Sequence, residues 1–269
     1  MDAVLGKKVA APQYYAPGVL ERIDRSLGRG GITGPSLHVD QGHDVWHCYE
    51  LSWLLPDGQV RYATGVLVVP ASSPFTVESK SLKLYLNSLN AHVFENDNAA
   101  IRCICNDLAA VTGSAVMLEI MSSVDLRSAS WLLDDIAHLG RGSGSTTRFS
   151  CSGFRSLCPV TAQPDWASLV VDVSSPHFNA GLIRESVDAL RNHQGFHEQC
   201  IEDLFTRLER ALTPDELHVV GFFQRRGGID ITPWRSSQAC KPRFERLFEQ
   251  SGKAGRRRVS GSAKTRYPN

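Results

Sequence analysis

Residues 154–166, Phe-Arg-Ser-Leu-Cys-Pro-Val-Thr-Ala-Gln-Pro-Asp-Trp, hold a cysteine between strand-like segments, with an aspartate seven residues after it. Because proline lacks a backbone N–H and fixes its own φ, Pro159 and Pro164 stop a helix or a central strand from running through. We therefore expect a stiff turn that presents the thiol of Cys158. Such a thiol can be a nucleophile where its surroundings favour the thiolate, and it can equally be a small, half-buried apolar residue.

The segments around this turn predict strands and helices in an order that occurs twice. In the second half we expect strands at 148–154 and 166–173, helices at 179–190 and 196–212, and strands at 217–224 and 229–234. In the first half we expect strands at 45–53 and 60–69, helices at 81–86 and 96–111, and a strand at 115–120. The motifs at 89–92 and 190–193 occupy the same place in each half. The order predicts an α+β chain with a duplicated ββααββ unit, each copy an antiparallel sheet with a helix pair on one face.

The domain organisation follows from this repeat. We expect an N-terminal module at 1–145, which includes an irregular arm with a helical piece at 19–27, a loop-like stretch at 121–146 and a Gly/Ser linker at 140–145. The C-terminal module is expected at 146–250. Residues 251–269 form a basic Gly/Ser-rich tail that we expect to be disordered.

Charge and composition exclude several classes of protein. Six of the 29 basic residues lie in the tail, which has no acid, so 23 basic residues face 28 acidic ones in residues 1–250. A mildly acidic body predicts no direct nucleic-acid binding. No apolar run approaches the roughly 20 residues that span a bilayer. Seven cysteines without a regular framework, and a start without a signal peptide, predict a reduced, cytoplasmic protein.

Neither a dinucleotide fingerprint nor a metal site is visible in the sequence. The glycines at 28–34 fail the Rossmann pattern, because Thr33 interrupts it and a helix-like segment precedes it. Cys103 and Cys105 lie two apart on a predicted helix, so that their side chains diverge by about 200°. We therefore expect no metal.

Candidate acid–base groups gather in the second half of the chain. His197 and Glu198 open the predicted long helix, where a carboxylate also simply favours the helix dipole. Together with Cys158 and Asp165 they form a plausible set for nucleophilic and acid–base chemistry.

Two cationic stretches suit a phosphate. Residues 78–83, Glu-Ser-Lys-Ser-Leu-Lys, begin a predicted helix, and residues 225–228, Arg-Arg-Gly-Gly, form a predicted tight turn. The alternative for the first stretch is a solvated helix start that is capped by Ser79 or Ser81.

Taken together, four motifs closely resemble the NADPH-dependent 7-cyano-7-deazaguanine reductases, the nitrile reductases of queuosine biosynthesis, in their long two-module form. The motifs are ESKSLKLYLNS at 78–88, Cys158 with QPDW at 163–166, FHEQC at 196–200 and RRGGIDITPWRS at 225–236. The resemblance covers residues 40–236.

The resemblance implies a tunnelling fold (T-fold) with two modules per chain, NADPH as the cofactor and pairing into a homodimer. It implies that Cys158 forms a covalent thioimide with the nitrile carbon, that Asp165 is the general acid and that His197 handles protons beside the substrate. The substrate contacts that it implies are Thr76, Val77, Glu78, His197 and Glu198. The cofactor contacts that it implies are Ser79, Lys80, Arg226 and Gly227.

Three other classes of protein share some of these features. A cofactor-free Cys/His/Asp hydrolase or amidinotransferase would use the same thiol, but the two cationic stretches argue against it. A zinc-dependent T-fold enzyme related to GTP cyclohydrolase would need ligands at spacings that the sequence lacks. A catalytically silent purine-binding module would have no need of Cys158, Asp165 and His197 together.

Overall fold

The structure is a computed structural model that describes residues 11–32, 36–121, 126–129, 135–141, 144–242 and 246–249. The tail that we expected to be disordered, residues 251–269, lies outside the described residues.

The first half contains the predicted hairpin and helix pair. β2 (Gly42–Leu54) and β3 (Val60–Pro70) pair antiparallel, and α2 (Ser79–Ser88), α3 (Asp97–Thr112) and β5 (Met117–Met121) follow. α3 begins where the Asn96 side chain caps the backbone N–H of Ala99, and it ends at Gly113, whose φ of 70° is the left-handed conformation that suits glycine.

The second half repeats this order completely. β8 (Gly144–Leu157) and β9 (Pro164–Ser174) form a hairpin, α4 (Ala180–Ala189) and α5 (His197–Leu212) follow, and β10 (Glu216–Phe223) pairs with β11 (Ile229–Ser236). The predicted α+β class and the strand–strand–helix–helix–strand order in both halves are thus confirmed. Among the described strands, the complete ββααββ unit is seen in the second half, whereas only β5 follows the helix pair of the first half in the same sheet.

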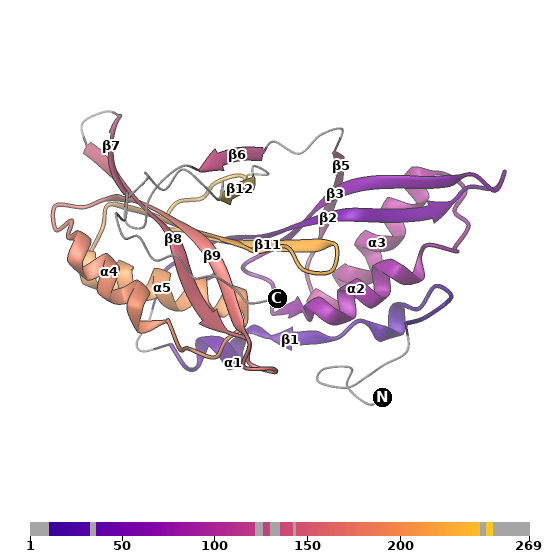
Figure 1. Cartoon of the computed structure of the whole chain (residues 1–269), viewed down its shortest axis with the longest axis horizontal. Helices are drawn as coiled ribbons and strands as arrows, with labels where there is room; N and C mark the ends of the chain where they lie inside the picture. The colour runs from indigo at the N-terminus through magenta and orange to yellow at the C-terminus, as the bar shows by residue number, and fades with distance from the viewer. Residues whose placement is uncertain are drawn as a thin grey trace, which may run out of the picture.

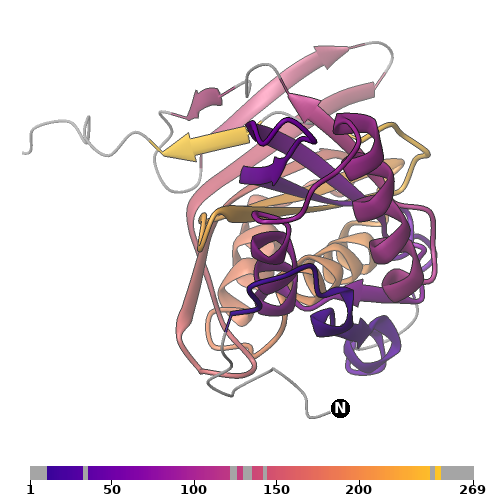
Figure 2. The same cartoon turned by 90° about the vertical axis from the view of Figure 1, so that its right-hand side faces the viewer.

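One eight-stranded antiparallel sheet joins the two halves, in the order β5-β3-β2-β11-β10-β9-β8-β7. β11 pairs with β2 from Ile229 opposite Cys48 to Arg235 opposite Gly42, so the last strand of the second half lies beside the first strand of the first. The four long helices cover one face of this sheet, each pair over its own hydrophobic core (Figures 1 and 2). β6 (Leu126–Ala129) and β12 (Arg246–Glu249) pair with each other on the opposite side.

Two local expectations were wrong. The arm at 19–27 is not one helix, because β1 (Arg22–Asp24) pairs with β4 (Phe75–Val77) and the helix α1 (Arg25–Arg29) starts only afterwards; a short 3-10 turn, η1 (Pro17–Val19), precedes them. The stretch 140–145 is not a linker, because β7 (Asp135–Arg141) and β8 form a hairpin across it, with Gly140 opposite Ser145. At the first place, pairing with a distant strand overrides the local sequence signal, and at the second a hairpin between neighbouring segments does so.

A buried ion network ties the two halves to the arm. Asp44 of β2 accepts hydrogen bonds from Arg25 of α1 at 2.6 Å and from Arg235 of β11 at 2.8 Å. Arg235 also donates to Glu202 of α5 at 2.8 Å, and Arg29 of α1 donates to the same carboxylate at 2.7 Å. Asp44 and Arg235 are fully buried, so every charge there needs its partners.

We expect Asp44→Asn to lower the free energy of unfolding by about 3–5 kcal/mol, because it leaves two buried guanidinium groups short of an anion. Urea unfolding measures the loss. Arg61→Met is the matched control, since it breaks the exposed Arg61–Asp97 ion pair, and it should change stability far less. Equal losses in the two variants would show that the buried network does not hold the halves together.

Candidate active site

The Cys158 turn is the loop of the β8–β9 hairpin. The backbone N–H of Cys158 donates to the carbonyl of Gln163 at 2.8 Å, and the N–H of Ala162 donates back to the carbonyl of Cys158 at 3.0 Å. Ala162 has a φ of 55°, and Pro164 stands at the first position of β9, where a proline removes no central ladder bond. The half-buried thiol is therefore held on a tight, closed loop, as the sequence predicted.

A cavity of about 370 Å³ lies beside this loop and collects groups from distant parts of the chain. It is lined by most of the predicted site residues, namely Val77, Glu78, Ser79, Lys80, Cys158, Asp165, His197, Glu198 and Arg226. They come from β4 and the start of α2, the β8–β9 hairpin, the start of α5 and the turn before β11. The structure thus brings both halves of the chain to one cavity.

Two predicted residues lie just outside this cavity. Thr76 is buried behind it, and its hydroxyl donates to Glu198 Oε1 at 3.2 Å, which makes it a support for that carboxyl. Gly227 lines a neighbouring cavity.

Asp165 sits between a cation and a histidine. Its Oδ1 lies 2.7 Å from Nη1 of Arg226, and its Oδ2 lies 3.5 Å from Nε2 of His197. Arg226 also donates through Nη2 to the carbonyl of Pro164 at 2.6 Å, so the guanidinium binds both the carboxylate of Asp165 and the backbone of the preceding residue. The imidazole of His197 stacks on Phe223, with ring centroids 4.1 Å apart, which fixes its orientation.

The two glutamates lie in different environments. Glu78 is the N-cap of α2, and its carboxylate accepts the backbone N–H groups of Lys80 at 2.9 Å and Ser81 at 2.8 Å. The expectation that Ser79 or Ser81 caps this helix is therefore wrong, because both hydroxyls lie inside the helix that Glu78 begins.

Glu198 lies in the first turn of α5 and is almost completely buried. Burial raises the pKa of its carboxyl, the nearby Asp44 carboxylate adds to the rise, and His197 and Arg25 oppose it. The cavity therefore offers one carboxylate held by backbone amides and one carboxyl group that binds its proton more tightly than usual.

Sequence reasoning gave no role to Lys83, although the motif contains it. Lys83 follows Lys80 by three residues on α2, a spacing that puts both side chains on one helix face, and that was the available signal. It lines the cavity, and burial lowers the pKa of its ammonium group, an effect that Glu78 and Asp165 oppose. Ile23, in the wall of the cavity, carried no such signal, because only the pairing of β1 with β4 brings it there.

Neither a metal cluster nor a membrane span is found in the part of the chain that the structure describes. No three His, Cys, Asp or Glu side chains within it are placed to hold a metal ion. None of its helices is long and apolar enough to cross a bilayer.

Comparison with known proteins identifies the family. A family described as "Nitrile reductase, 7-cyano-7-deazaguanine-reductase N-term" matches residues 11–120. An NADPH-dependent 7-cyano-7-deazaguanine reductase of Stenotrophomonas maltophilia is 36% identical over 88% of this chain and 93% of its own. The chain belongs to the 7-cyano-7-deazaguanine reductase family.

Other relatives agree with this membership. A reductase of the same name from Psychrobacter cryohalolentis is 37% identical over 93% of this chain and 99% of its own, and a family described as "QueF-like protein" matches residues 164–242. The crystal structure of an archaeosine synthase QueF-like protein in its apo form is 21% identical and covers 38% of this chain and all of its own, with a TM-score of 0.33. That likeness is too low to bear on fold or function.

We expect Glu198→Gln to raise the free energy of unfolding at pH 7 by on the order of 1 kcal/mol or more. The raised pKa means that the folded protein binds this proton more tightly than the unfolded chain, whose Glu has the ordinary value near 4.5. Wild-type stability therefore falls as pH rises from 4.5 through the folded-state pKa, whereas Gln carries no charge to bury and still accepts from Thr76.

Urea unfolding of both proteins between about pH 4 and pH 8 measures the effect. The stability that Glu198→Gln gains over the wild type should shrink to nothing as the pH falls to about 4.5, the ordinary pKa of Glu. A constant difference across the range would contradict the assigned cause.

Proposed function

We propose that this protein reduces the nitrile of 7-cyano-7-deazaguanine to the aminomethyl group of 7-aminomethyl-7-deazaguanine, with NADPH as the reductant, in queuosine biosynthesis. The observation that carries the proposal is the cavity in which Cys158, Asp165 and His197 meet Glu78 and Glu198. The reductase names of the relatives support the substrate and the cofactor.

Cys158 is proposed as the nucleophile. Its sulfur bonds to the nitrile carbon, one π bond of the nitrile breaks and the nitrogen gains a proton, which yields a thioimide. Asp165 takes the thiol proton and delivers a proton to the nitrogen. His197 exchanges protons with the same carboxylate, whose Oδ2 lies 3.5 Å from the histidine Nε2. Arg226 positions Asp165 for this transfer by holding its other oxygen.

The substrate's ring is proposed to bind through its donor edge. A guanine-like edge presents N–H groups, which the carboxyl oxygens of Glu78 and Glu198 can accept. Val77 contributes apolar wall, and Thr76 holds Glu198 from behind.

The cavity rim fits the phosphate-bearing cofactor. Ser79 and Lys80 lie in the first turn of the ten-residue helix α2 and line the cavity together with Arg226, so that a hydroxyl and two cationic groups are available to phosphate oxygens, and Gly227 follows Arg226 in the chain. NADPH supplies one hydride in each of the two reductions that a nitrile needs to become an amine. Gly227 has a φ of 57°, a conformation that favours glycine, and the Lys83 side chain packs close to it.

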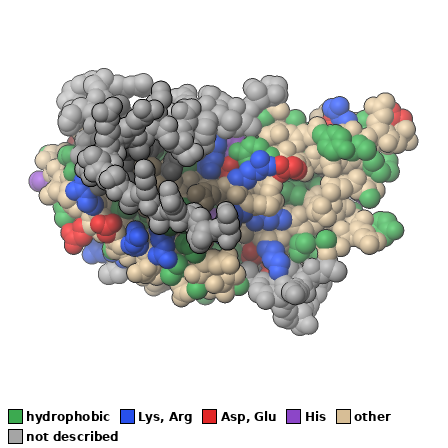
Figure 3. Space-filling view, viewed as in Figure 1, with side chains coloured by type: hydrophobic (Ala, Val, Ile, Leu, Met, Phe, Trp, Pro, Cys, Tyr) green, Lys and Arg blue, Asp and Glu red, His purple; other side chains and the backbone are tan. Residues whose placement is uncertain are grey.

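We also propose the assembly and the placement of the enzyme. A homodimer is supported by β5, an edge strand of the described sheet that exposes Met117 and Ile120. We propose two modules, with the boundary before the β7–β8 hairpin instead of at 145, the second module ending at 250 and 251–269 as a tail, and we place the enzyme in the cytoplasm. Acidic and basic side chains are interspersed over the described part of the face in Figure 3, which supports the proposal that the protein does not bind nucleic acid directly.

With 7-cyano-7-deazaguanine as the only added substrate, we expect two NADPH to be oxidised for each nitrile consumed, and NADH to be used much less efficiently. Lys80 and Arg226 suit the additional ribose phosphate of NADPH. Absorbance of the reduced nicotinamide gives the stoichiometry and both values of kcat/KM. Equal efficiency with the two cofactors would refute the role given to these cations.

Without NADPH, the protein should gain the mass of one substrate per site. Cys158→Ala should abolish this gain, and Asp165→Asn should slow it by roughly 10²-fold or more, because a positioned acid–base group contributes about that much. Intact-protein and peptide mass spectrometry locate the adduct. Cys240→Ala is the control and should form it normally; an adduct on any cysteine other than Cys158 would refute the mechanism.

A further inference from the structure

Two neighbouring strands of the sheet cease to pair where they reach the candidate active site. In β10 and β11, which the structure describes in full, the pairing ends at Val220 opposite Trp234. The next residue of β11 is Pro233, which has no backbone N–H to donate to a ladder. Beyond this point β10 runs on beside β9 to Phe223, and β11 runs beside β2 back to Ile229. No ladder therefore joins the two strand ends that flank the β10–β11 turn.

Arg246 of β12 joins these two strand ends from the side of the sheet opposite the helices. Its Nη2 donates to the carbonyl of Phe223 on β10, and its Nε lies 3.0 Å from Oδ2 of Asp230 on β11. Its Nη1 also lies 3.5 Å from the hydroxyl of Thr232 on β11. The Arg246 side chain is buried, so its charge needs these partners. The planar guanidinium presents several donors at once and can therefore bridge two strands, which a single ammonium group does less well.

Each of the two strand ends carries a group that contacts Asp165. The ring of Phe223 stacks on the imidazole of His197, whose Nε2 lies 3.5 Å from Asp165 Oδ2. Arg226 lies in the turn before β11, where its backbone N–H donates to the carbonyl of Ile229 at 2.8 Å. Its guanidinium lies 2.7 Å from Asp165 Oδ1. The distance between the two strand ends therefore decides how His197 and Arg226 meet the aspartate.

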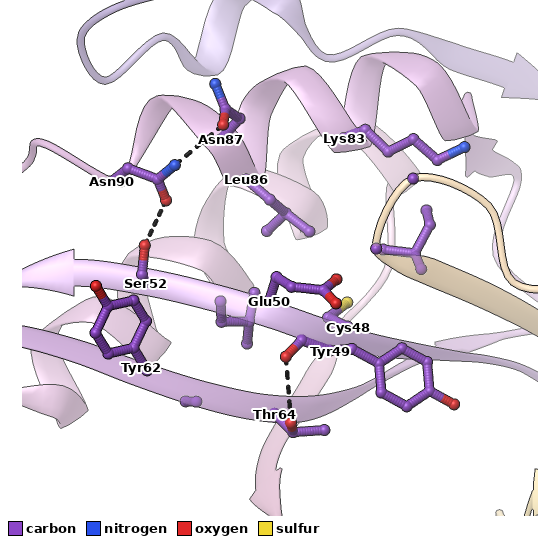
Figure 4. Close-up of a pocket in the computed structure, with 15 residues that line it drawn as sticks. Cys48, Tyr49, Glu50, Ser52, Tyr62, Thr64, Lys83, Leu86, Asn87 and Asn90 are labelled. Carbon is purple, nitrogen blue, oxygen red and sulfur yellow. Dashed lines mark hydrogen bonds between the residues drawn. The ribbon is translucent and has the colours of Figure 1, made fainter.

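Asp230 is connected to the Arg226 turn by a second route. Its Oδ2 accepts the hydroxyl of Tyr49 at 2.6 Å, and the ring of Tyr49 points away from α2 in the neighbouring cavity that Figure 4 shows. The guanidinium of Arg225, the residue before Arg226, lies over this ring at 4.2 Å from its centroid. The backbone N–H of Tyr49 also donates to the carbonyl of Gly228 at 2.9 Å. A shift of Asp230 would therefore be felt throughout the turn.

We propose that Arg246 is a positioning residue for the covalent step. By joining the ends of β10 and β11, it holds His197 and Arg226 where they orient Asp165. Arg246 is not among the described residues that line the cavity, so it acts through Phe223 and Asp230 and not on the substrate. The inference rests on the proposed function, because that function gives Asp165 and His197 their roles.

The test removes the guanidinium and keeps a long side chain. Arg246→Met loses the hydrogen bonds to both strand ends. The matched control is Arg148→Met, which breaks another arginine–aspartate pair on the same face of the sheet, between Arg148 Nε and Asp172 Oδ1 at 2.6 Å. Neither Arg148 nor Asp172 lines the cavity.

The measurement is the rate at which the full-length protein gains the mass of 7-cyano-7-deazaguanine on Cys158 without NADPH. Rapid mixing, acid quenching and intact-protein mass spectrometry at a series of substrate concentrations give the maximal rate and the half-saturating concentration. Urea unfolding shows that each variant is folded under the conditions of the assay.

We expect Arg246→Met to lower the maximal rate by about tenfold or more, because small displacements of an acid–base group are costly. The half-saturating concentration should stay near the wild-type value, since Glu78 and Glu198 lie on other elements. Arg148→Met should form the adduct at the wild-type rate. A role in stability alone would lower the free energy of unfolding and leave the rate of the folded protein unchanged.

A double variant tests whether Arg246 acts through Asp165. In the Asp165→Asn background, Arg246→Met should slow adduct formation little further, because the group that it positions is already lost, whereas independent effects would multiply. If Arg246→Met does not fold, Arg246→Lys gives the same comparison with a smaller loss, because it keeps a cation beside Asp230 but has one nitrogen in place of three.

Two results would overturn the inference: a wild-type maximal rate in the folded Arg246 variant, or losses that multiply in the double variant. A failure of the proposed function is recognised separately, because the wild type itself would then form no adduct on Cys158.

Discussion

The buried ion network around Asp44 is the constraint on which the rest of the structure depends. Asp44 belongs to the first half of the chain and Arg235 to the second, and each is fully removed from water. Burying a charge costs several kcal/mol unless its partners are in place, so these residues tolerate one relative position of the two halves. The β2–β11 pairing fixes how the two halves lie side by side in the sheet. The buried ion network fixes how closely they approach each other. Because residues of both halves line the cavity, its geometry depends on this fixed relative position of the halves.

The same network brings the N-terminal arm into the site. Arg25 reaches Asp44, and Arg29 reaches both Glu202 and the carbonyl of Ala71. These contacts anchor α1, which follows β1 directly, and so hold Ile23 in the cavity wall. An arm without its own core is thereby made part of a binding surface.

The cavity gathers groups that are unfavourable for folding and useful for chemistry. Burial raises the pKa of Glu198 and lowers that of Lys83, and both shifts mean that the charged form is disfavoured by its surroundings. Neighbours offset part of this cost: His197 and Arg25 oppose the pKa shift of Glu198, and Glu78 and Asp165 oppose that of Lys83. Such an arrangement keeps polar groups fixed before a ligand arrives, which is what electrostatic preorganisation requires.

The sequence alone predicted the repeat, the types of the long helices and strands, and most of the predicted site residues that the structure brings to the cavity. Pro159 and Pro164, which both follow Cys158, predicted its closed turn, because the constraints that proline places on the backbone act locally. The hydrophobic periodicity of the sequence predicted the long helices and strands, since an amphipathic pattern shows which face of an element is buried. The functional motifs could be recognised from their residues, order and spacing. Residue type alone shows where a thiol, an acid or a cation is available for chemistry.

Only the tertiary structure decided what depends on contacts between distant segments. The β1–β4 pairing replaced the helix expected in the arm, because β4, far along the chain, supplied the hydrogen bonds. The β7–β8 hairpin replaced the expected linker by pairing two segments that are neighbours in the sequence. The capping role of Glu78 depends on where α2 begins. The raised pKa of Glu198 depends on its burial and also on Asp44, which lies 154 positions earlier in the chain. Burial and charge proximity are properties of three-dimensional neighbours, and no local pattern in the sequence encodes them.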